Sequence, residues 1–233
     1  MIDQLAVVDH STDSTPQIVR ALGAEIYDQR ELMPELGPVR GKGDAMWRAL
    51  PSLRGDVVCF LDADSQEFGS HFVRGLLGPL LCEPDITFVK GFYRRPFRLG
   101  EVTLPDEGGR VTELTAKPLL AHFYPELAGI RQPLAGELAA RRHLLERLPF
   151  VTGYGVDIAL LLDAYRTTGL AAIAQVDLDV RQNDHQRLRD LGPMASAVLE
   201  AVLSRVQREG RLLGEPLAAP VERPPLVDLR AAA

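Results

Sequence analysis

The stretch that most constrains the fold is Val57–Asp64, V-V-C-F-L-D-A-D, in which a short apolar run ends in two aspartates. An apolar run this short and rich in Val and Phe predicts a strand buried on both faces. Because side chains alternate along a strand, Asp62 and Asp64 should leave its carboxyl end pointing the same way. That edge of a parallel sheet is where α/β proteins bind ligands.

Two neighbouring carboxylates repel each other unless a cation or a polar ligand lies between them. Carboxylate oxygens suit Mg²⁺ or Mn²⁺, which bind through one or two carboxylates together with phosphate oxygens. The D-A-D pattern therefore favours a divalent-metal site at this edge. The alternative is a strand that simply ends in a polar turn, because a D-x-D pattern alone is weakly specific.

The composition narrows the class of protein. A chain of 233 residues with 46% hydrophobic residues can bury the core of one large domain. A net charge of -6 argues against a general nucleic-acid binder, so an anionic ligand needs a local basic pocket. The two cysteines form no disulfide framework, and we find no membrane-spanning run or signal-peptide pattern. We expect a cytoplasmic, soluble protein that binds neither nucleic acid nor membrane.

The first part of the chain predicts a β-α-β unit. Leu5–Asp9 is a second apolar run that ends in an acid, and Ala24–Tyr27 predicts a short strand. Between them, Ser14 or Thr15 can cap a helix. We therefore expect two parallel strands joined by a right-handed crossover. The polar loop after Asp9 should then lie above the same sheet edge as Asp62 and Asp64. Plain turn and cap chemistry is the alternative for that loop.

Basic residues follow in three places. Lys42 stands between two glycines at the start of a helix predicted from Asp44 to Leu53, where it can reach a phosphate; a solvated lysine is the alternative. Lys90, Arg94 and Arg95 lie close together after a predicted strand. Farther on, Arg110 precedes Thr112, a good helix cap, and can grip an anion there; a charged surface loop is the alternative.

The remaining helices and strands are predicted from the periodicity of apolar residues and from the Pro and Gly residues that separate them. The predicted helices are Phe68–Leu81, Leu138–Leu148, Ile158–Tyr165 and Leu188–Arg208, and the predicted strands are Asp85–Val89 and Ala171–Val180. The segment from about Gly214 is Pro-rich and should lie across the surface or on a partner subunit.

Several of these stretches occur together in one family. The blocks, in order, are V-V-D-H-S-T-D, G-K-G-D-A-M-W, F-L-D-A-D, V-K-G-F-Y-R-R-P, G-G-R-V-T-E-L, Q-P-L-A-G-E, G-Y-G-V-D and E-R-P-P-L. Over nearly its whole length the chain resembles the glucosyl-3-phosphoglycerate and mannosyl-3-phosphoglycerate synthases, which are retaining glycosyltransferases of the GT-A fold. The resemblance implies an α/β fold with a Rossmann-like mixed sheet flanked by helices and a helical C-terminal extension.

The resemblance also implies an organisation of the chain and a set of site residues. Residues 1–130 would bind the nucleotide-sugar, residues 131–213 would complete the same domain with the acceptor site, and residues 214–233 would form a tail. The implied catalytic residues are Asp62, Asp64 and Asp157. The implied donor-binding residues are Asp9, Ser11, Lys42, Asp62, Leu134, Ala135, Gly136 and Tyr154. The implied acceptor-binding residues are Gly109, Arg110, Thr112, Arg181 and His185. The implied ligands of Mg²⁺ or Mn²⁺ are Asp64 with His185 or Asn183.

Three departures from the family pattern stand out. Family members begin with a further strand and helix, whose P-A-L-N-E-E-like loop wraps the nucleotide, so we expect a fold that lacks the first β-α unit. The family has R-x-H-x-N where this chain has R-Q-N-D-H, which places Asn183 at the metal-ligand histidine unless the loop shifts to bring His185 there. The family carries glutamate at Asp157, a side chain longer by one methylene.

The expected function is the metal-dependent transfer of glucose from a UDP-glucose type donor to the 2-hydroxyl of 3-phosphoglycerate, with retention, by a homodimer. One alternative is mannose transfer from GDP-mannose. Phosphatases of the haloacid dehalogenase type also place D-x-D after a buried strand, with the first aspartate as nucleophile. An inactive fragment or a nucleotide-sugar-binding remnant is the third alternative.

Overall fold

The computed structural model describes residues 2–65, 68–99, 102–104, 108–181, 187–212 and 220–231. Its centre is a mixed sheet in the order β3-β7-β4-β9, formed by Val57–Phe60, Leu138–Arg141, Phe88–Arg94 and Ile173–Val180. Strand β7 runs antiparallel to both neighbours, and β4 runs parallel to β9. Strands β3, β4 and β9 therefore share one direction, and their carboxyl ends meet at one edge with the start of β7.

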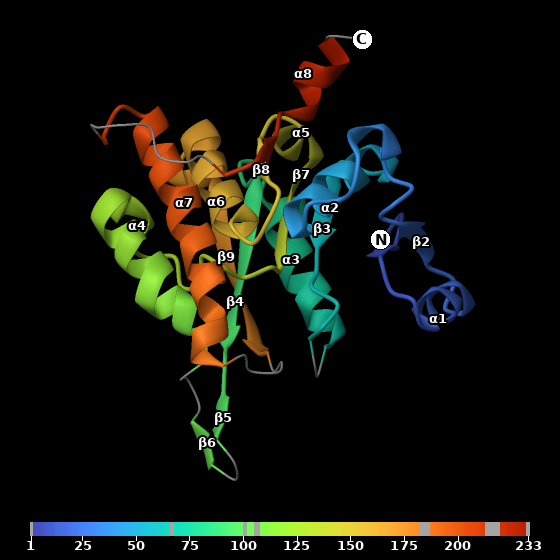
Figure 1. Cartoon of the computed structure of the whole chain (residues 1–233), viewed down its shortest axis with the longest axis horizontal. Coiled ribbons are helices and arrows are strands. Elements are labelled where there is room, and N and C mark those ends of the chain that lie inside the picture. Colours follow the sequence, from blue (N-terminus) through green and yellow to red (C-terminus); the bar gives the residue numbers. More distant parts are fainter. Residues whose placement is uncertain are drawn as a thin grey trace.

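Helices cover both faces of this sheet, which confirms the expected mixed α/β fold. Helix α3 (Ser70–Cys82) packs on one face, and α6 (Val156–Thr168), α7 (Gly192–Arg208) and α4 (Lys117–Phe123) lie on the other (Figure 1). The strands alternate between two cores, because Phe88, Leu138 and Ala140 face the larger core while Val89 and Ala139 face α3. Within the described residues, every helix is too short or too polar to cross a lipid bilayer.

One predicted helix is wrong. Residues Leu138–Arg141 form strand β7, and only Arg142–Leu145 form a short helix, α5. Leu138, Ala139 and Ala140 are fully buried between β3 and β4, where a strand satisfies its backbone groups by pairing on both sides. Leu and Ala favour helices in isolation, but tertiary pairing overrides that preference here.

The other predicted elements are present with shifted bounds. Helix α2 spans Lys42–Ala49, strand β4 begins later than expected, and the last long helix starts with a 3-10 turn, Leu188–Leu191. Thr112 is not a helix cap, because the helical run already begins at Arg110 and continues through a π-helical segment, Thr112–Ala116, into α4. Before this helical run, β5 (Phe97–Leu99) and β6 (Val102–Leu104) form an antiparallel pair. Further 3-10 turns span Pro34–Leu36, Leu50–Ser52, Pro125–Leu127 and Leu170–Ala172.

The predicted β-α-β unit at the start of the described chain is confirmed. Strands β1 (Ala6–Asp9) and β2 (Glu25–Asp28) pair in parallel, with α1 (Thr15–Ala21) between them. Its first turn is capped by the Asp13 carboxylate and not by Ser14, since Asp13 Oδ1 accepts the Thr15 N–H at 2.8 Å.

This β1-α1-β2 unit makes a two-stranded sheet of its own, apart from the central sheet (Figure 1). No residue between positions 2 and 31 is buried. Polar contacts tie the unit to the rest of the chain: the Arg54 N–H donates to Gln4 Oε1 at 2.7 Å, and the Arg54 guanidinium pairs with Glu25. The unit is therefore attached by few contacts.

The C-terminal segment fastens helix α2. Strand β10 (Glu222–Arg223) pairs antiparallel with β8 (Phe150–Val151), followed by helix α8 (Leu226–Ala231). Arg223 Nε donates to the fully buried Asp44 Oδ1 at 2.7 Å, and Trp47 Nε1 donates to the Pro224 carbonyl at 2.8 Å. Burial alone would raise the pKa of Asp44, but Arg223 and Arg48 lower it to about 2. This clamp fixes the helix that carries Lys42 at its first turn.

Replacing Gly43 with alanine should unfold or strongly destabilise the protein. A Cβ there would lie 1.8 Å from the Val151 carbonyl oxygen and 2.9 Å from the Val156 side chain, so backbone would have to move. We expect a loss of roughly 3 kcal/mol in urea unfolding, as for severe overpacking. Gly78→Ala, in the interior of α3 with nothing within 4 Å of the new Cβ, is the matched control and should be neutral or stabilising. Equal stabilities of the two variants would contradict the close packing of α2 on β8.

Candidate functional site

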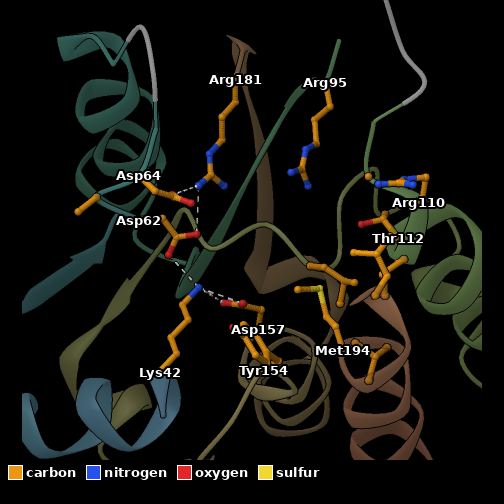
Figure 2. Close-up of a pocket in the computed structure, with 16 residues that line it drawn as sticks. Lys42, Asp62, Asp64, Arg95, Arg110, Thr112, Tyr154, Asp157, Arg181 and Met194 are labelled. Atoms are coloured by element: carbon orange, nitrogen blue, oxygen red, sulfur yellow. Dashed lines mark hydrogen bonds and ion pairs between the residues drawn. The ribbon is translucent and has the colours of Figure 1, made fainter. Parts of the chain in front are cut away.

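A cavity of about 520 Å³ lies at the edge where β3, β4 and β9 end (Figure 2). Most of the residues expected from the sequence line it: Lys42, Asp62, Asp64, Gly109, Arg110, Thr112, Leu134, Tyr154, Asp157 and Arg181. The topology explains their convergence. Asp62 and Asp64 follow β3, Arg181 follows β9, and Leu134 precedes β7, so the sheet brings distant parts of the sequence to one edge.

At one end of the cavity, Lys42 bridges two carboxylates. Its Nζ lies 2.9 Å from Asp62 Oδ1 and 3.0 Å from Asp157 Oδ2, so the ends of α2, β3 and α6 meet at this ammonium group (Figure 2). Burial alone would lower the pKa of Lys42, but Asp157 and Asp62 outweigh it and raise that pKa. Burial opposes ionisation of Asp62 as well, yet Lys42 and Arg181 lower its pKa. Both groups therefore carry charge at neutral pH.

Gly136 makes this contact possible. A Cβ on it would lie 2.1 Å from Asp62 Oδ2 and 2.5 Å from Lys42 Nζ. Only a residue without a side chain lets the segment before β7 pass this close to the ion pair. The predicted proximity of Gly136 to the donor-binding residues therefore has a steric basis.

The guanidinium of Arg181 lies between the two D-A-D carboxylates and two buried groups. Nη2 donates to Asp64 Oδ1 at 2.6 Å and to Asp62 Oδ2 at 3.4 Å, while Nη1 donates to Tyr93 Oη at 2.9 Å and to Glu137 Oε2 at 3.3 Å. Burial raises the pKa of Glu137, and Arg181 opposes that rise. The structure thus places Arg181 beside the acid pair, and its acceptor-binding role stays a prediction.

Sequence reasoning gave no site role to several residues that shape the site. Glu137 and Tyr93 are buried and hold Arg181, and Lys90 is buried with its Nζ donating to the Asp157 carbonyl at 3.1 Å. Burial lowers the pKa of Lys90 to about 8, against the opposing charge of Asp157. The signal for Lys90 and Glu137 was a charged residue inside an otherwise apolar strand segment, V-K-G-F and L-A-G-E-L-A.

The opposite end of the cavity is basic. Arg110 and Arg95 point into it from the far side of the acid pair, with Thr112 beside them (Figure 2). Gly109 has φ +74°, a left-handed conformation that glycine adopts without strain, and its carbonyl accepts the Glu113 N–H of the following helix. The sequence marked Arg95 as part of a basic group with Lys90 and Arg94 but gave it no site role, and it did not mark the apolar lining residues Leu191, Met194 and Val198 of the helical C-terminal part. Arg110 at the start of the helical run, together with Arg95 just after β4, suits an anionic ligand.

The other expected site residues lie elsewhere or are not described. Asp9 and Ser11 are not among the residues that line the cavity; Ser11 Oγ donates to Asp9 Oδ2 at 2.8 Å in the β1-α1-β2 unit. Ala135 is buried in the core against α3. Asn183 and His185 lie outside the described residues. The nucleotide role of Asp9 and Ser11 and the metal role of the 183–185 segment therefore stay predictions.

The acid pair suits a divalent cation that takes only part of its ligands from protein. Among the residues that the structure describes, no three His, Cys, Asp or Glu side chains gather as a full metal cage. Mg²⁺ and Mn²⁺ bind through one or two carboxylates with water or phosphate completing the shell. Asp64, 68% exposed at the cavity, offers such a carboxylate, and the Arg181 guanidinium beside it shows that this position already holds a positive charge.

Comparison with known proteins identifies a family that this chain matches. Residues 3–135 match the model of glycosyl transferase family 2, a stretch that includes the D-A-D run. Glucosyl-3-phosphoglycerate synthase from Petrotoga mobilis is 45% identical over 213 residues, 91% of this chain; the chain spans 66% of that relative, slightly less than two thirds of its length.

Two solved structures superpose closely. Mannosyl-3-phosphoglycerate synthase from Rubrobacter xylanophilus has a TM-score of 0.89 and 45% identity, covering 98% of this chain and 80% of the other. Glucosyl-3-phosphoglycerate synthase from Mycobacterium tuberculosis, solved with Mn²⁺, UDP and glucosyl-3-phosphoglycerate, has a TM-score of 0.84 and 42% identity, covering 98% of this chain and 81% of the other.

Proposed function

The chain belongs to glycosyl transferase family 2, and from that premise we propose that it transfers glucose from a UDP-glucose type donor to the 2-hydroxyl of 3-phosphoglycerate with retention. The observation that carries the proposal is one cavity with an acid pair and a lysine at one end and two arginines at the other. The acid pair suits the cation that accompanies the diphosphate of a nucleotide-sugar, and the arginines suit the anionic groups of a phosphorylated acid. The Mycobacterium tuberculosis neighbour was solved with Mn²⁺, UDP and glucosyl-3-phosphoglycerate.

The family match also bears on the alternatives. Because it covers Asp62 and Asp64, it favours a glycosyltransferase over a phosphatase with Asp62 as nucleophile. Lys42 supports this choice, since an aspartate paired with an ammonium group at 2.9 Å is a weakened nucleophile. An inactive remnant is separated from an enzyme by measuring glucose transfer to 3-phosphoglycerate with Mg²⁺ or Mn²⁺ present.

The donor end works through charge. Asp64, with Asp62 behind it, would hold Mg²⁺ or Mn²⁺ against the donor diphosphate. When bound, that cation supplies Lewis-acid stabilisation of the negative charge on the departing diphosphate. Lys42 stays protonated through Asp62 and Asp157 and adds a second positive charge at the same place. Leu134, Gly136 and Tyr154 would line the pocket for the donor sugar.

The acceptor end works through position. Arg110, Gly109 and Thr112 would hold the phosphate and carboxylate of 3-phosphoglycerate, so that its hydroxyl lies within reach of the anomeric carbon. Asp157 is ion-paired to Lys42 at 3.0 Å, which makes it a poor covalent nucleophile. This supports attack by the acceptor on the same face from which the diphosphate leaves, and such attack retains the configuration.

The alternative, mannose transfer from GDP-mannose, is supported by the similarity to the Rubrobacter xylanophilus mannosyl-3-phosphoglycerate synthase. The test is a direct competition between UDP-glucose and GDP-mannose at equal concentration, with 3-phosphoglycerate and Mn²⁺. Exclusive glucosyl product supports the proposal, and predominant mannosyl product replaces it with the alternative. We also propose that the protein is a cytoplasmic homodimer. Sedimentation velocity tests whether it is a dimer.

Replacing Arg110 with alanine should raise the KM for 3-phosphoglycerate by roughly 10- to 100-fold, since a charge-assisted contact to a carboxylate or phosphate is lost. The KM for the donor should change less than about twofold. Initial-rate kinetics with each substrate varied in turn measure both. Arg74→Ala removes an exposed arginine of α3 outside the cavity lining and serves as control. An equal rise in both KM values would remove Arg110 from the acceptor site.

A further inference from the structure

Arg181 contacts the carboxylate oxygens that a divalent cation would use. Its Nη2 lies 2.6 Å from Asp64 Oδ1 and 3.4 Å from Asp62 Oδ2. A cation bound to the same carboxylate oxygen would face the guanidinium at close range, and two positive charges at that distance repel each other. Asp64 therefore cannot serve both partners well at once.

The two members of this pair differ in mobility. The Arg181 side chain is 5% exposed and is fixed on its inner side by Tyr93 Oη at 2.9 Å and by the Glu137 carboxylate at 3.1 Å. The Asp64 side chain is 68% exposed, and within the described part of the chain Arg181 is its one hydrogen-bond partner. If the pair separates, Asp64 moves and Arg181 stays.

We infer that Arg181 is the resident counter-ion of Asp64, and that a divalent cation binds by exchange, with Asp64 turning from the guanidinium to the metal. The inference rests on the proposed function for the presence of that cation. The fixed guanidinium neutralises the acid pair before the donor arrives, and it weakens cation binding in the absence of the donor. Once released, the Nη2 donors face the phosphate oxygens that accompany the cation.

The test measures the binding of Mn²⁺ alone, without nucleotide, from the electron paramagnetic resonance signal of the free ion. Removing Arg181 by itself would leave Glu137, 1% exposed, as an uncompensated buried charge, so the variant is Arg181→Gln with Glu137→Gln. We expect it to bind Mn²⁺ about tenfold more tightly than the wild-type chain, because a competing ion pair at 2.6 Å is gone. Glu137→Gln alone keeps the contact of Arg181 with Asp64 and should bind Mn²⁺ no more tightly than the wild type does. Unchanged or weaker Mn²⁺ binding by the double variant overturns the inference.

Two further variants separate the possible failures. Arg94→Met removes a positive charge from the end of β4, where Arg94 pairs with Asp179, and it should leave Mn²⁺ binding unchanged. Equal tightening by Arg94→Met would mean a bulk charge effect and would overturn the inference. Asp64→Asn in the wild-type background should abolish Mn²⁺ binding; if it does not, the metal role in the proposed function fails instead.

Two further measurements test the inference if the double variant does not fold. Arg181 contacts Glu137 through Nη1 and Asp64 through Nη2. The shorter side chain of Arg181→Lys, held by the buried Glu137, does not also reach Asp64, so this variant should tighten Mn²⁺ binding about threefold; no tightening overturns the inference. A crystal structure of the wild-type chain with Mn²⁺ should show Asp64 Oδ1 beyond hydrogen-bond distance from Arg181 while the pair of Arg181 with Glu137 is kept. An intact contact of Asp64 with Arg181 beside a bound Mn²⁺ would also overturn it.

Discussion

Replacing Asp64 with asparagine is expected to lower kcat for sugar transfer by roughly 10³-fold or more while leaving the fold intact. In our proposal this carboxylate holds the cation that offsets charge on the departing diphosphate, and removing one such electrostatic contribution costs about 10²- to 10³-fold in well-studied enzymes. Asparagine has the same shape and can still accept a hydrogen bond from Arg181, so only the charge is lost. Asp64 is largely exposed, which is why stability should change little.

The measurement is single-turnover transfer from UDP-glucose at saturating Mn²⁺, with thermal unfolding recorded in parallel. Asp56→Asn is the matched control, because Asp56 is an exposed aspartate just before β3, at the opposite end of the same strand. That variant should keep wild-type rates. Undiminished transfer by Asp64→Asn would remove the carboxylate from the mechanism.

Gly136→Ala is expected to have the second largest effect, a loss of about 10²-fold or more in kcat/KM. The new methyl group would lie 2.1 Å from Asp62 Oδ2 and 2.5 Å from Lys42 Nζ, so one or both side chains must leave their positions. Misplacement of catalytic groups by about 1 Å can cost this much. Because the atoms met first are the ends of side chains, the loss of stability should be smaller than that of Gly43→Ala.

The control for Gly136→Ala is Gly129→Ala in the same connecting segment, where a Cβ meets nothing within 4 Å. It should keep both activity and stability. Steady-state kinetics and urea unfolding of the two variants give the comparison. A Gly136→Ala enzyme as active as Gly129→Ala would mean that the ion pair of Lys42 and Asp62 does not matter for transfer.

The part of the site that follows one strand was predictable, because alternation along an extended chain needs no knowledge of its neighbours. Asp62 and Asp64 do converge after β3, both on Arg181, and Lys42 does reach the same edge from its helix start. The direction of β3 relative to β4 and β9 also followed from ordinary α/β topology.

What could not be predicted depends on contacts between distant residues. The stretch Leu138–Arg141 has helical propensity, and only its burial between β3 and β4 makes it a strand. The partners of Arg181, Tyr93 and Glu137, stand 88 and 44 positions away from it, and nothing local marks such pairs. The antiparallel pair of β8 and β10 likewise joins segments whose own patterns are too short to predict strands.

The weakly attached β1-α1-β2 unit has a consequence for how the molecule opens. With no buried residue from position 2 to position 31, this unit lacks the apolar burial that sets the stability of the central sheet. Its backbone amides should exchange with deuterium through local opening, long before those of β4 and β7, whose residues lie at the centre of the core. Since the unit carries Asp9 and Ser11, a donor that contacts them spends part of its binding free energy on ordering this unit, and protection of these amides would report donor occupancy.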